Sequence, residues 1–389
     1  MITTIVIFIA VLAVLVLVHE FGHFIVAKKS GMKVEEFGFG FPPRLIGIQK
    51  VDGKWRIVWF HRKTSTTLSL DKIETPLLKQ GGDNESTIYS INLIPLGGFV
   101  KIMGENNEQE NDPRSFINRS FWGRFFTLVA GVTMNVILAW MLTSGGYIAG
   151  LPVALDNPED LPKNAQFINK QVAIIEVVKD FPAEKAGIKP TDIVLKIDGQ
   201  DVTILQDLQS YIRANAGKEL VFTIKRGEST QDIKVQSQVP TEDQGPTGIA
   251  LAYMGKLKYP VFTAFAEGAK TTVFQLKSIV VGLYEFFANK PSLDNLGGPV
   301  RIAKLTGEVA DLGWVYLLQF TSFLSLNLAI LNILPFPALD GGRVLFLIVE
   351  KIRGKRNNQK IEQWANTLGF VLLLLLMLLV TIKDVKGII

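Results

Sequence analysis

Residues 1–23 read MITTIVIFIAVLAVLVLVHEFGH, and this stretch decides how the rest of the chain is interpreted. Met1–Val18 carries no charged side chain, and a helix that crosses a bilayer needs about 20 mostly apolar residues. A secretory signal peptide would require Lys or Arg before its apolar run, and none is present here. His19 and Glu20 follow the run directly. The stretch therefore predicts a first membrane span that ends in ionisable side chains.

Three further uncharged stretches approach or exceed the length of a span, and they are Phe125–Leu155, Leu312–Leu339 and Gln363–Ile382. The sequence thus predicts a multi-span α-helical membrane protein with about four transmembrane helices. Lys and Arg near span ends mark the cytoplasmic side. Three basic clusters fit that side: Lys28, Lys29 and Lys33; Arg119 and Arg124; and Arg343, Lys351, Arg353, Lys355, Arg356 and Lys360. The loop from about 150 to 313 is then expected to face outward.

The formal net charge of +5 is accounted for by basic residues near membrane ends, and the sequence contains no nucleic-acid-binding motif. We therefore expect the lipid bilayer, and no nucleic acid, as a partner. The expected segments are transmembrane helices at 1–27, 120–150, 312–342 and 363–383; a cytoplasmic or membrane-associated β-rich loop at 28–119; an α+β domain at 165–255; an amphipathic region at 256–311; and a basic amphipathic cytoplasmic segment at 343–362.

The loop after the first span is rich in β-branched and aromatic residues. Lys54–His61 and Thr87–Met103 are typical of strands, and Gly97-Gly98 indicates a bulge or a close approach of backbone. Glu35–Pro43 is interpreted as a glycine-rich apolar loop, and Glu105–Arg114 as a polar connection. The sequence predicts a membrane-associated β-hairpin or sheet here.

A compact unit is expected within the outward loop, at about 170–240. Strands are predicted at Ala173–Val178, Asp192–Ile197, Leu220–Lys225 and Asp232–Val239, with a helix at Asp207–Asn215. Ala186–Val194 followed by Ile197-Asp198-Gly199 resembles a bacterial-type PDZ domain. That resemblance implies a groove that binds a peptide or protein end as an added strand. A β-rich exterior domain of another kind is the alternative. Thr263–Asn289 is interpreted as an amphipathic helix and not as a fifth span.

The chemistry of the chain is indicated by His19-Glu20-Phe21-Gly22-His23, an H-E-x-x-H motif. Residues i and i+4 of a helix share a face, so His19 and His23 can reach one Zn²⁺, and Glu20 beside them can act as general base on water. The chain has no cysteine, so nitrogen and oxygen must supply every ligand. A His/Glu cluster that merely reaches the interface at a span end is the alternative interpretation.

A catalytic zinc ion takes three protein ligands, so a third must be found. His61, the remaining histidine, lies in a basic strand-like segment and is expected at the surface. Asp340 is the better candidate because Pro335 and Pro337 break the helix before it and let the backbone bend. An aspartate inside a membrane protein needs a partner cation. The alternative is a helix-terminal residue at the interface.

H-E-x-x-H in the first span together with Asn332-x-x-Pro-x-Pro-x-Leu-Asp340-Gly resembles the paired signature of site-2 proteases, of the bacterial regulator-of-sigma-E protease type. The resemblance covers nearly the whole chain. It implies His19, His23 and Asp340 as ligands of one Zn²⁺, Glu20 as general base, and Asn332 near the substrate or the oxyanion. A helix-packing hydrogen bond is the alternative role for Asn332.

Two further elements resemble the family. Gly131-x-x-x-Asn135 lies in the second span, where Gly131 permits close packing and Asn135 can contact the catalytic core. Ile94–Val100, with Gly97 and Gly98, resembles the strand that holds extended substrate. Val132 stands where many relatives have proline, and the stretch at 55–84 is longer than is typical.

The family resemblance implies a zinc metalloendopeptidase in the inner (plasma) membrane of a bacterium, with its PDZ domain outside the cytoplasm. Expected substrates are single-span membrane proteins such as anti-sigma factors or signal-peptide remnants. One alternative is a catalytically inactive, PDZ-bearing membrane scaffold. A transporter with a metal in its pathway is another, but the sequence shows no inverted repeats.

Overall fold

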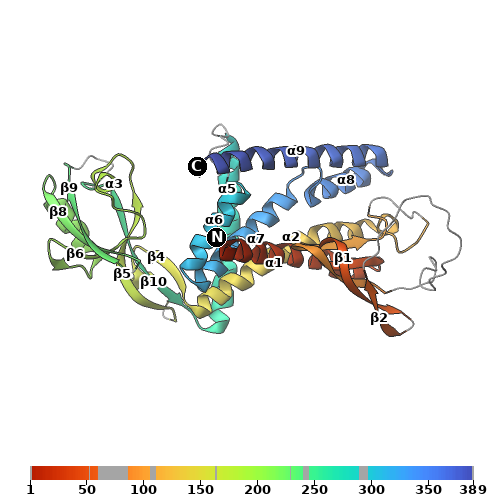
Figure 1. Ribbon diagram of the computed structural model, residues 1–389, viewed down its shortest axis with the longest axis horizontal. Coiled ribbons are helices and arrows are strands. Elements are labelled where there is room, and N and C mark those ends of the chain that lie inside the picture. Colours follow the sequence, from red (N-terminus) through yellow and green to blue (C-terminus); the bar gives the residue numbers. More distant parts are fainter. Residues whose placement is uncertain are drawn as a thin grey trace. The chain divides into compact units, whose positions relative to one another are not determined.

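The computed structural model describes residues 2–51, 53–59, 86–105, 111–162, 164–227, 229–239, 245–288 and 297–387. The chain divides into two compact units (Figure 1). The membrane unit comprises 1–143 and 269–389, and the inserted unit comprises 144–268. Each unit is described by itself.

Four helices of the described chain are long and apolar enough to cross a membrane, and they are α1 (Ile2–Lys29), α2 (Phe121–Ala149), α7 (Trp314–Ile333) and α9 (Gln359–Lys386). Helices α1, α7 and α9 belong to the membrane unit, and α2 belongs to it as far as Thr143. Their side chains are apolar along most of their length, and many remain exposed, as expected of surfaces that meet lipid. The predicted fold class is confirmed: four candidate spans, a separate β-sheet and an inserted α+β unit.

The third span ends earlier than the sequence predicted, whereas α2 lies within the segment expected at 120–150. Helix α2 stops at Ala149, and Leu151–Leu155 forms strand β4, because Gly150 adopts a positive φ of 103° that ends the helix. The third span stops at Ile333, since Pro335 and Pro337 cannot continue helical hydrogen bonding. The chain bends through residues 334–339, and α8 (Asp340–Arg353) begins at Asp340. Asp340 therefore opens a separate helix.

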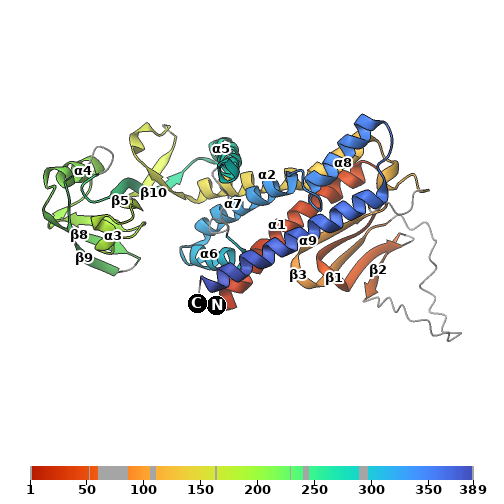
Figure 2. The ribbon, with the colours of Figure 1, turned by 90° about the horizontal axis from the view of Figure 1, so that it is seen from above.

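A three-stranded sheet follows α1, with β1 (Val34–Val51), β2 (Lys54–Trp59) and β3 (Ile88–Ile102) in the order β2-β1-β3 (Figures 1 and 2). The interpretation of Glu35–Pro43 as a loop was wrong, because this segment belongs to β1. Its glycines fit the sheet: a Cβ on Gly38 would lie 2.6 Å from the Asn92 amide nitrogen. His61 and most of the long stretch at 55–84 lie outside the described residues, as do residues 106–110 of the connection at 105–114.

The close approach of backbone predicted at Gly97-Gly98 is present. A Cβ on Gly97, whose φ is +100°, would lie 2.6 Å from the Val16 side chain. A Cβ on Gly98 would lie 3.0 Å from Leu17 Cδ1. These two glycines let β3 pack directly against α1 just before His19.

The inserted unit is α+β, as predicted. Its sheet has the order β4-β10-β5-β6-β8-β9, with β7 paired to β6. The strands are β4 (Leu151–Leu155), β5 (Gln166–Val177), β6 (Ile193–Ile197), β7 (Gln200–Asp201), β8 (Glu219–Arg226), β9 (Ser229–Gln236) and β10 (Ile249–Lys258); the helices are η2 (Pro158–Asp160), α3 (Pro182–Lys185) and α4 (Leu205–Ala214). Phe222, Ile174 and Leu208 are fully buried in its core. Strands β4 and β10, which were not predicted from the sequence, pair with each other.

Two helices connect the inserted unit to α7. The amphipathic helix predicted at Thr263–Asn289 is α5 (Val261–Ala288), and it is not among the candidate spans of the described chain. Helix α6 (Pro299–Asp311) follows. The carboxylate of Asp384, near the end of α9, accepts the backbone N–H of Arg301 at 3.0 Å. Since the first N–H groups of a helix lack internal partners, Asp384 caps α6 and joins it to α9.

Candidate metal centre

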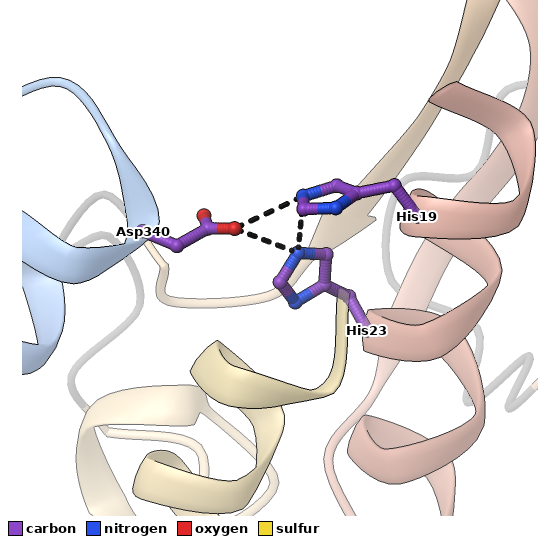
Figure 3. Close-up of side chains that lie close together, drawn as sticks. All are labelled: His19, His23 and Asp340. Carbon is purple, nitrogen blue, oxygen red and sulfur yellow. Dashed lines mark hydrogen bonds and ion pairs between the residues drawn. The ribbon is translucent and has the colours of Figure 1, made fainter. Parts of the chain in front are cut away.

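The two histidines of α1 lie one helical turn apart on the same face. His19 and His23 are 6% and 7% exposed, and their ring centroids are 4.9 Å apart. Two imidazoles in so little contact with water need polar partners on their ring nitrogens. Figure 3 shows both rings turned toward α8.

Asp340 is the third group at this point, although 321 residues separate it from His19. Its Oδ2 lies 3.0 Å from His19 Nε2 and 3.3 Å from His23 Nε2, and the two Nε2 atoms are 3.2 Å apart (Figure 3). The bend before α8 places the carboxylate there. A Cβ on Gly341 would lie 2.2 Å from the Ile333 carbonyl oxygen, so only glycine allows this bend to close.

The three donor atoms fit a zinc ion in size and chemistry. Tetrahedral zinc holds nitrogen and oxygen ligands at about 2.0–2.1 Å, which separates the ligand atoms by about 3.3 Å. The observed separations of 3.0, 3.2 and 3.3 Å match one face of such a tetrahedron. His19, His23 and Asp340 can therefore hold one metal ion and leave a fourth position open.

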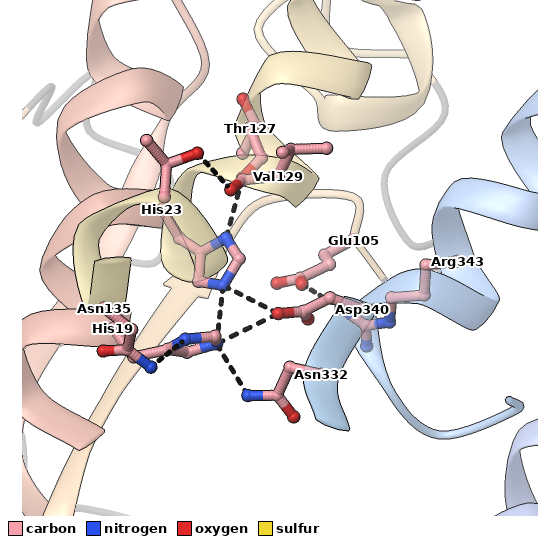
Figure 4. Close-up of polar contacts among 10 residues, drawn as sticks. His19, His23, Glu105, Thr127, Val129, Asn135, Asn332, Asp340 and Arg343 are labelled. Carbon is pink, nitrogen blue, oxygen red and sulfur yellow. Dashed lines mark hydrogen bonds and ion pairs between the residues drawn. The ribbon is translucent and has the colours of Figure 1, made fainter. Parts of the chain in front are cut away.

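The outer nitrogen of each imidazole meets helix α2. The backbone carbonyl of Thr127 accepts a hydrogen bond from His23 Nδ1 at 2.7 Å, which leaves the Nε2 lone pair free for a metal (Figure 4). His19 Nδ1 lies 3.2 Å from the amide nitrogen of Asn135. The amide oxygen of Asn135 is buried and has no partner among the described residues. Exchanging the amide oxygen and nitrogen gives that oxygen the His19 Nδ1–H to accept, and Nε2 again faces the metal.

Gly131 explains why α2 can come so close. A Cβ at this position would lie 2.4 Å from His23 Nε2 and 2.6 Å from His19 Cε1. Any larger residue would displace both rings. Gly131 and Asn135 are one turn apart and thus present the same face of α2 to the histidines.

Glu20 lines two cavities, and Asp340 lines both of them as well. One, of about 430 Å³, is also lined by His23, Glu35, residues 99–105 at the end of β3, Asp340 and Arg343. The other, of about 200 Å³, is lined by Val16, His19, Leu328, Asn332, Ala338, Leu339 and Asp340. Asn332 Nδ2 lies 3.5 Å from His19 Nε2. Glu20 and Asn332 thus both face space in which a peptide could lie.

The other expected site residues, Asn135, Gly97 and Gly98, do not line these two cavities. Asn135 is fully buried against His19 and lines neither of these two cavities. Gly97 and Gly98 are buried against α1, and the part of β3 that lines the larger cavity begins at Phe99.

Sequence analysis missed one ion pair of the site. Arg343, one turn into α8, pairs with Glu105, which follows β3 (Figure 4). The pair joins the sheet to the helix that carries Asp340. No local pattern connects two residues 238 positions apart. The sequence indicated Arg343 only as one member of a basic cluster and Glu105 only as the first residue of a polar connection.

Comparison with known proteins shows the family to which the chain belongs. The family model for peptidase family M50 matches residues 7–61 and 72–376. The chain belongs to peptidase family M50. This M50 peptidase is thus an enzyme of the site-2 protease family, as predicted from its sequence.

Curated relatives of this M50 peptidase match along nearly their whole length. A Clostridium acetobutylicum relative is 32% identical over 97% of this chain and 96% of its own. The regulator of sigma-W protease RasP of Bacillus subtilis is 30% identical over 99% of both chains. The zinc metalloprotease RasP of Geobacillus kaustophilus is 27% identical over 97% of both. The PDZ domain of an SdrC-like protein from Listeria innocua matches 21% of this chain and 92% of that domain, with 25% identity and a TM-score of 0.19.

Proposed function

We propose that this M50 peptidase is a zinc-dependent intramembrane endopeptidase that cuts single-span membrane proteins. One observation carries the proposal: His19 and His23 of a candidate span, Ile2–Lys29, converge with Asp340 beside a cavity that Glu20 lines. Relatives named zinc metalloprotease RasP and regulator of sigma-W protease support zinc and a role in regulated proteolysis. Anti-sigma factors and remnant signal peptides are the substrate types that we propose.

His19, His23 and Asp340 would hold one zinc ion. Bound there, zinc would polarise the scissile carbonyl and make water a nucleophile at neutral pH. The carbonyl of Thr127 and the amide of Asn135 orient the two imidazoles from behind. Asn332, which lines the smaller cavity, would donate its N–H to the oxyanion that develops on the scissile carbonyl.

Glu20 would carry the proton. Its carboxylate accepts a proton from the attacking water as the new C–O bond forms. It then delivers that proton to the nitrogen of the breaking C–N bond, so the amine leaves neutral and Glu20 returns to its starting state. Because the Glu20 side chain lines both cavities, it would accept the proton of water and deliver it to the leaving nitrogen from one position on α1.

The substrate would lie in extended form along residues 99–105. A peptide bond inside a helix is shielded, whereas a chain that pairs with a strand exposes its backbone. Gly97 and Gly98 would contribute indirectly, by bringing this strand against α1 beside Glu20.

The proposal is tested with purified protein in liposomes that also contain a model single-span protein with a short exterior segment. We expect zinc-dependent cleavage within or beside the span, with product ends mapped by mass spectrometry. Cleavage that survives complete zinc removal, or that occurs only in soluble peptides, would contradict it.

We also propose that the inserted unit is a PDZ domain outside the cytoplasm of a bacterial cell, where it reads the end of a trimmed substrate. Replacement of 151–258 by a short flexible linker, which removes β4 to β10 together, is expected to leave zinc binding unchanged. The same change should allow cleavage of a substrate that retains a bulky exterior domain. Cleavage of trimmed and untrimmed substrates is compared in liposomes. Loss of zinc from the shortened chain would show that the unit supports the metal centre.

A further prediction concerns Asn135. Asn135→Ala removes the partner of His19 Nδ1 and should weaken zinc binding about 10–100-fold, the usual cost of losing such a partner. Asn135→Asp keeps an oxygen acceptor and should restore most of the affinity. Competition with a zinc chelator measures both. Asn327→Ala serves as control, because Asn327 is partly exposed and, among the described residues, its side chain donates to the Phe323 carbonyl one turn before it. Equal zinc affinity in Asn135→Ala and wild type would refute this role.

A further inference from the structure

The bend before α8 contains a residue in a strained backbone conformation. Ala338, two positions before Asp340, has a φ of 74°, in the left-handed region that residues with a side chain rarely adopt. Such a conformation persists only where the surrounding structure holds it. The groups that hold Ala338 therefore also decide where the Asp340 carboxylate lies.

Asp340 differs from the two histidines in how its side chain is oriented. The outer nitrogens of His19 and His23 meet groups of α2, as described above. The Asp340 carboxylate has the two imidazoles themselves as its hydrogen-bonding partners among the described residues. Outer partners normally fix the direction of a metal ligand. Because the Asp340 side chain has no such partner there, its direction depends on the backbone of the bend.

Helix α9 contacts this bend at two positions on one face. The side-chain oxygen of Asn366 accepts the backbone N–H of Ala338 at 3.1 Å. Gly369, three residues later, is buried, and a Cβ there would lie 2.5 Å from the Pro337 carbonyl oxygen. Residues i and i+3 of a helix share a face. One face of α9 thus holds two consecutive residues of the bend.

This contact is not a by-product of extensive packing. The apolar side chains of α9 are largely exposed, as on a helix that meets lipid: Leu372 and Leu375 are 47% and 51% exposed. The buried residues of the described helix are Gly369, Val380 and Asp384. The last two meet the start of α6, so the buried contact in the first half of α9 is the one with the bend.

We propose that Asn366 is a positioning residue of the metal site. By accepting the Ala338 N–H, its amide oxygen keeps the bend in the conformation that presents Asp340 to the two histidines. Gly369 contributes by letting α9 come close enough for that hydrogen bond. The inference rests on the zinc site proposed above, and it gives α9, which supplies no ligand, a part in forming that site.

The zinc affinity of the full-length protein in liposomes, measured by chelator competition, tests the proposal. Asn366→Ala should weaken zinc binding about 3–10-fold, the usual net contribution of one hydrogen bond. Asn366→Asp keeps an oxygen acceptor and should bind zinc nearly as wild type does. Thr367→Ala is the matched control, because Thr367 is exposed and its hydroxyl donates to the Gln363 carbonyl of its own helix.

A variant of Ala338 separates positioning from a general loss of structure. Glycine adopts a positive φ without strain, so Ala338→Gly should make the bend less dependent on Asn366. Asn366→Ala should then cost less zinc affinity in the Ala338→Gly background than in wild type. An equal cost in both backgrounds would show that Asn366 does not act through the bend.

Gly369→Ala tests the same contact without removing a polar group. Alanine favours a helix, yet its Cβ would push α9 away from Pro337, so zinc binding should weaken. Gly282→Ala on α5 is its control, because a Cβ there meets open space. Wild-type zinc affinity in Asn366→Ala, or in Gly369→Ala where the first variant does not fold, would overturn the proposal. If wild type itself bound zinc no better than Asp340→Ala, the proposed zinc site would be wrong and the inference would fail with it.

Discussion

Glu20→Gln is expected to lower cleavage of a single-span substrate by about 10²–10⁴-fold, the usual contribution of a positioned acid–base group. The amide keeps the size and hydrogen-bonding capacity of the side chain but cannot take up the proton of water. Zinc content should equal that of wild type, because Glu20 is not among the three clustered donor groups. Cleavage in liposomes and metal analysis of the same preparation check both halves of the prediction.

Glu35→Gln is the matched control for Glu20→Gln. Glu35 lines the same cavity but pairs with Lys101 at 2.7 Å and is absent from the metal cluster. Its variant should retain most activity. If Glu20→Gln cleaves as fast as wild type, the general-base assignment fails. If the protein were a membrane scaffold without catalysis, neither the wild type nor the two variants would cleave the substrate.

Asp340→Ala is expected to weaken zinc binding by more than about 100-fold, beyond the 10–100-fold cost of losing an outer partner of a ligand. The change removes one of three ligands and leaves two buried imidazoles without the oxygen that both contact. Activity should be lost at ordinary zinc concentrations. Chelator competition and metal analysis of the purified variant measure the effect.

Asp384→Asn separates this result from the general effect of altering a buried aspartate. Asp384 is 7% exposed and caps α6, and it contributes nothing to the metal cluster. Its variant should bind zinc as wild type does. Wild-type zinc affinity in Asp340→Ala would mean that another residue supplies the third ligand. The next variant to measure would then be His61→Ala.

Much of the site could be predicted because its signals are local. H-E-x-x-H places two imidazoles on one helical face from spacing alone. The lack of cysteine and the two prolines before Asp340 favoured that residue as the third zinc ligand. The resemblance to the family implied the same role. Gly131 and Asn135 were predicted from their resemblance to an element of the family. What the local pattern could not show was which nitrogen of His19 each asparagine meets, because that depends on how two distant helices pack.

The parts that prediction missed depend on long-range contacts. Glu35–Pro43 has the glycines and prolines of a loop, yet pairing with β3 makes it a strand, since tertiary contacts outweigh local propensity. The Glu105–Arg343 pair joins segments with no shared periodicity. The third span is shorter than predicted, because apolar residues continue past the helix end at Ile333 but Pro335 and Pro337 prevent helical hydrogen bonding there.

The distance along the chain between His19 and Asp340 has a consequence for biosynthesis. A ribosome completes both histidines more than 300 residues before it reaches the aspartate. During translation the growing polypeptide holds only two of the three donors proposed to bind zinc, so the proposed metal site is incomplete until Asp340 is added. The proposed metal site therefore assembles only after the segment that carries Asp340 has been made and has packed against α1.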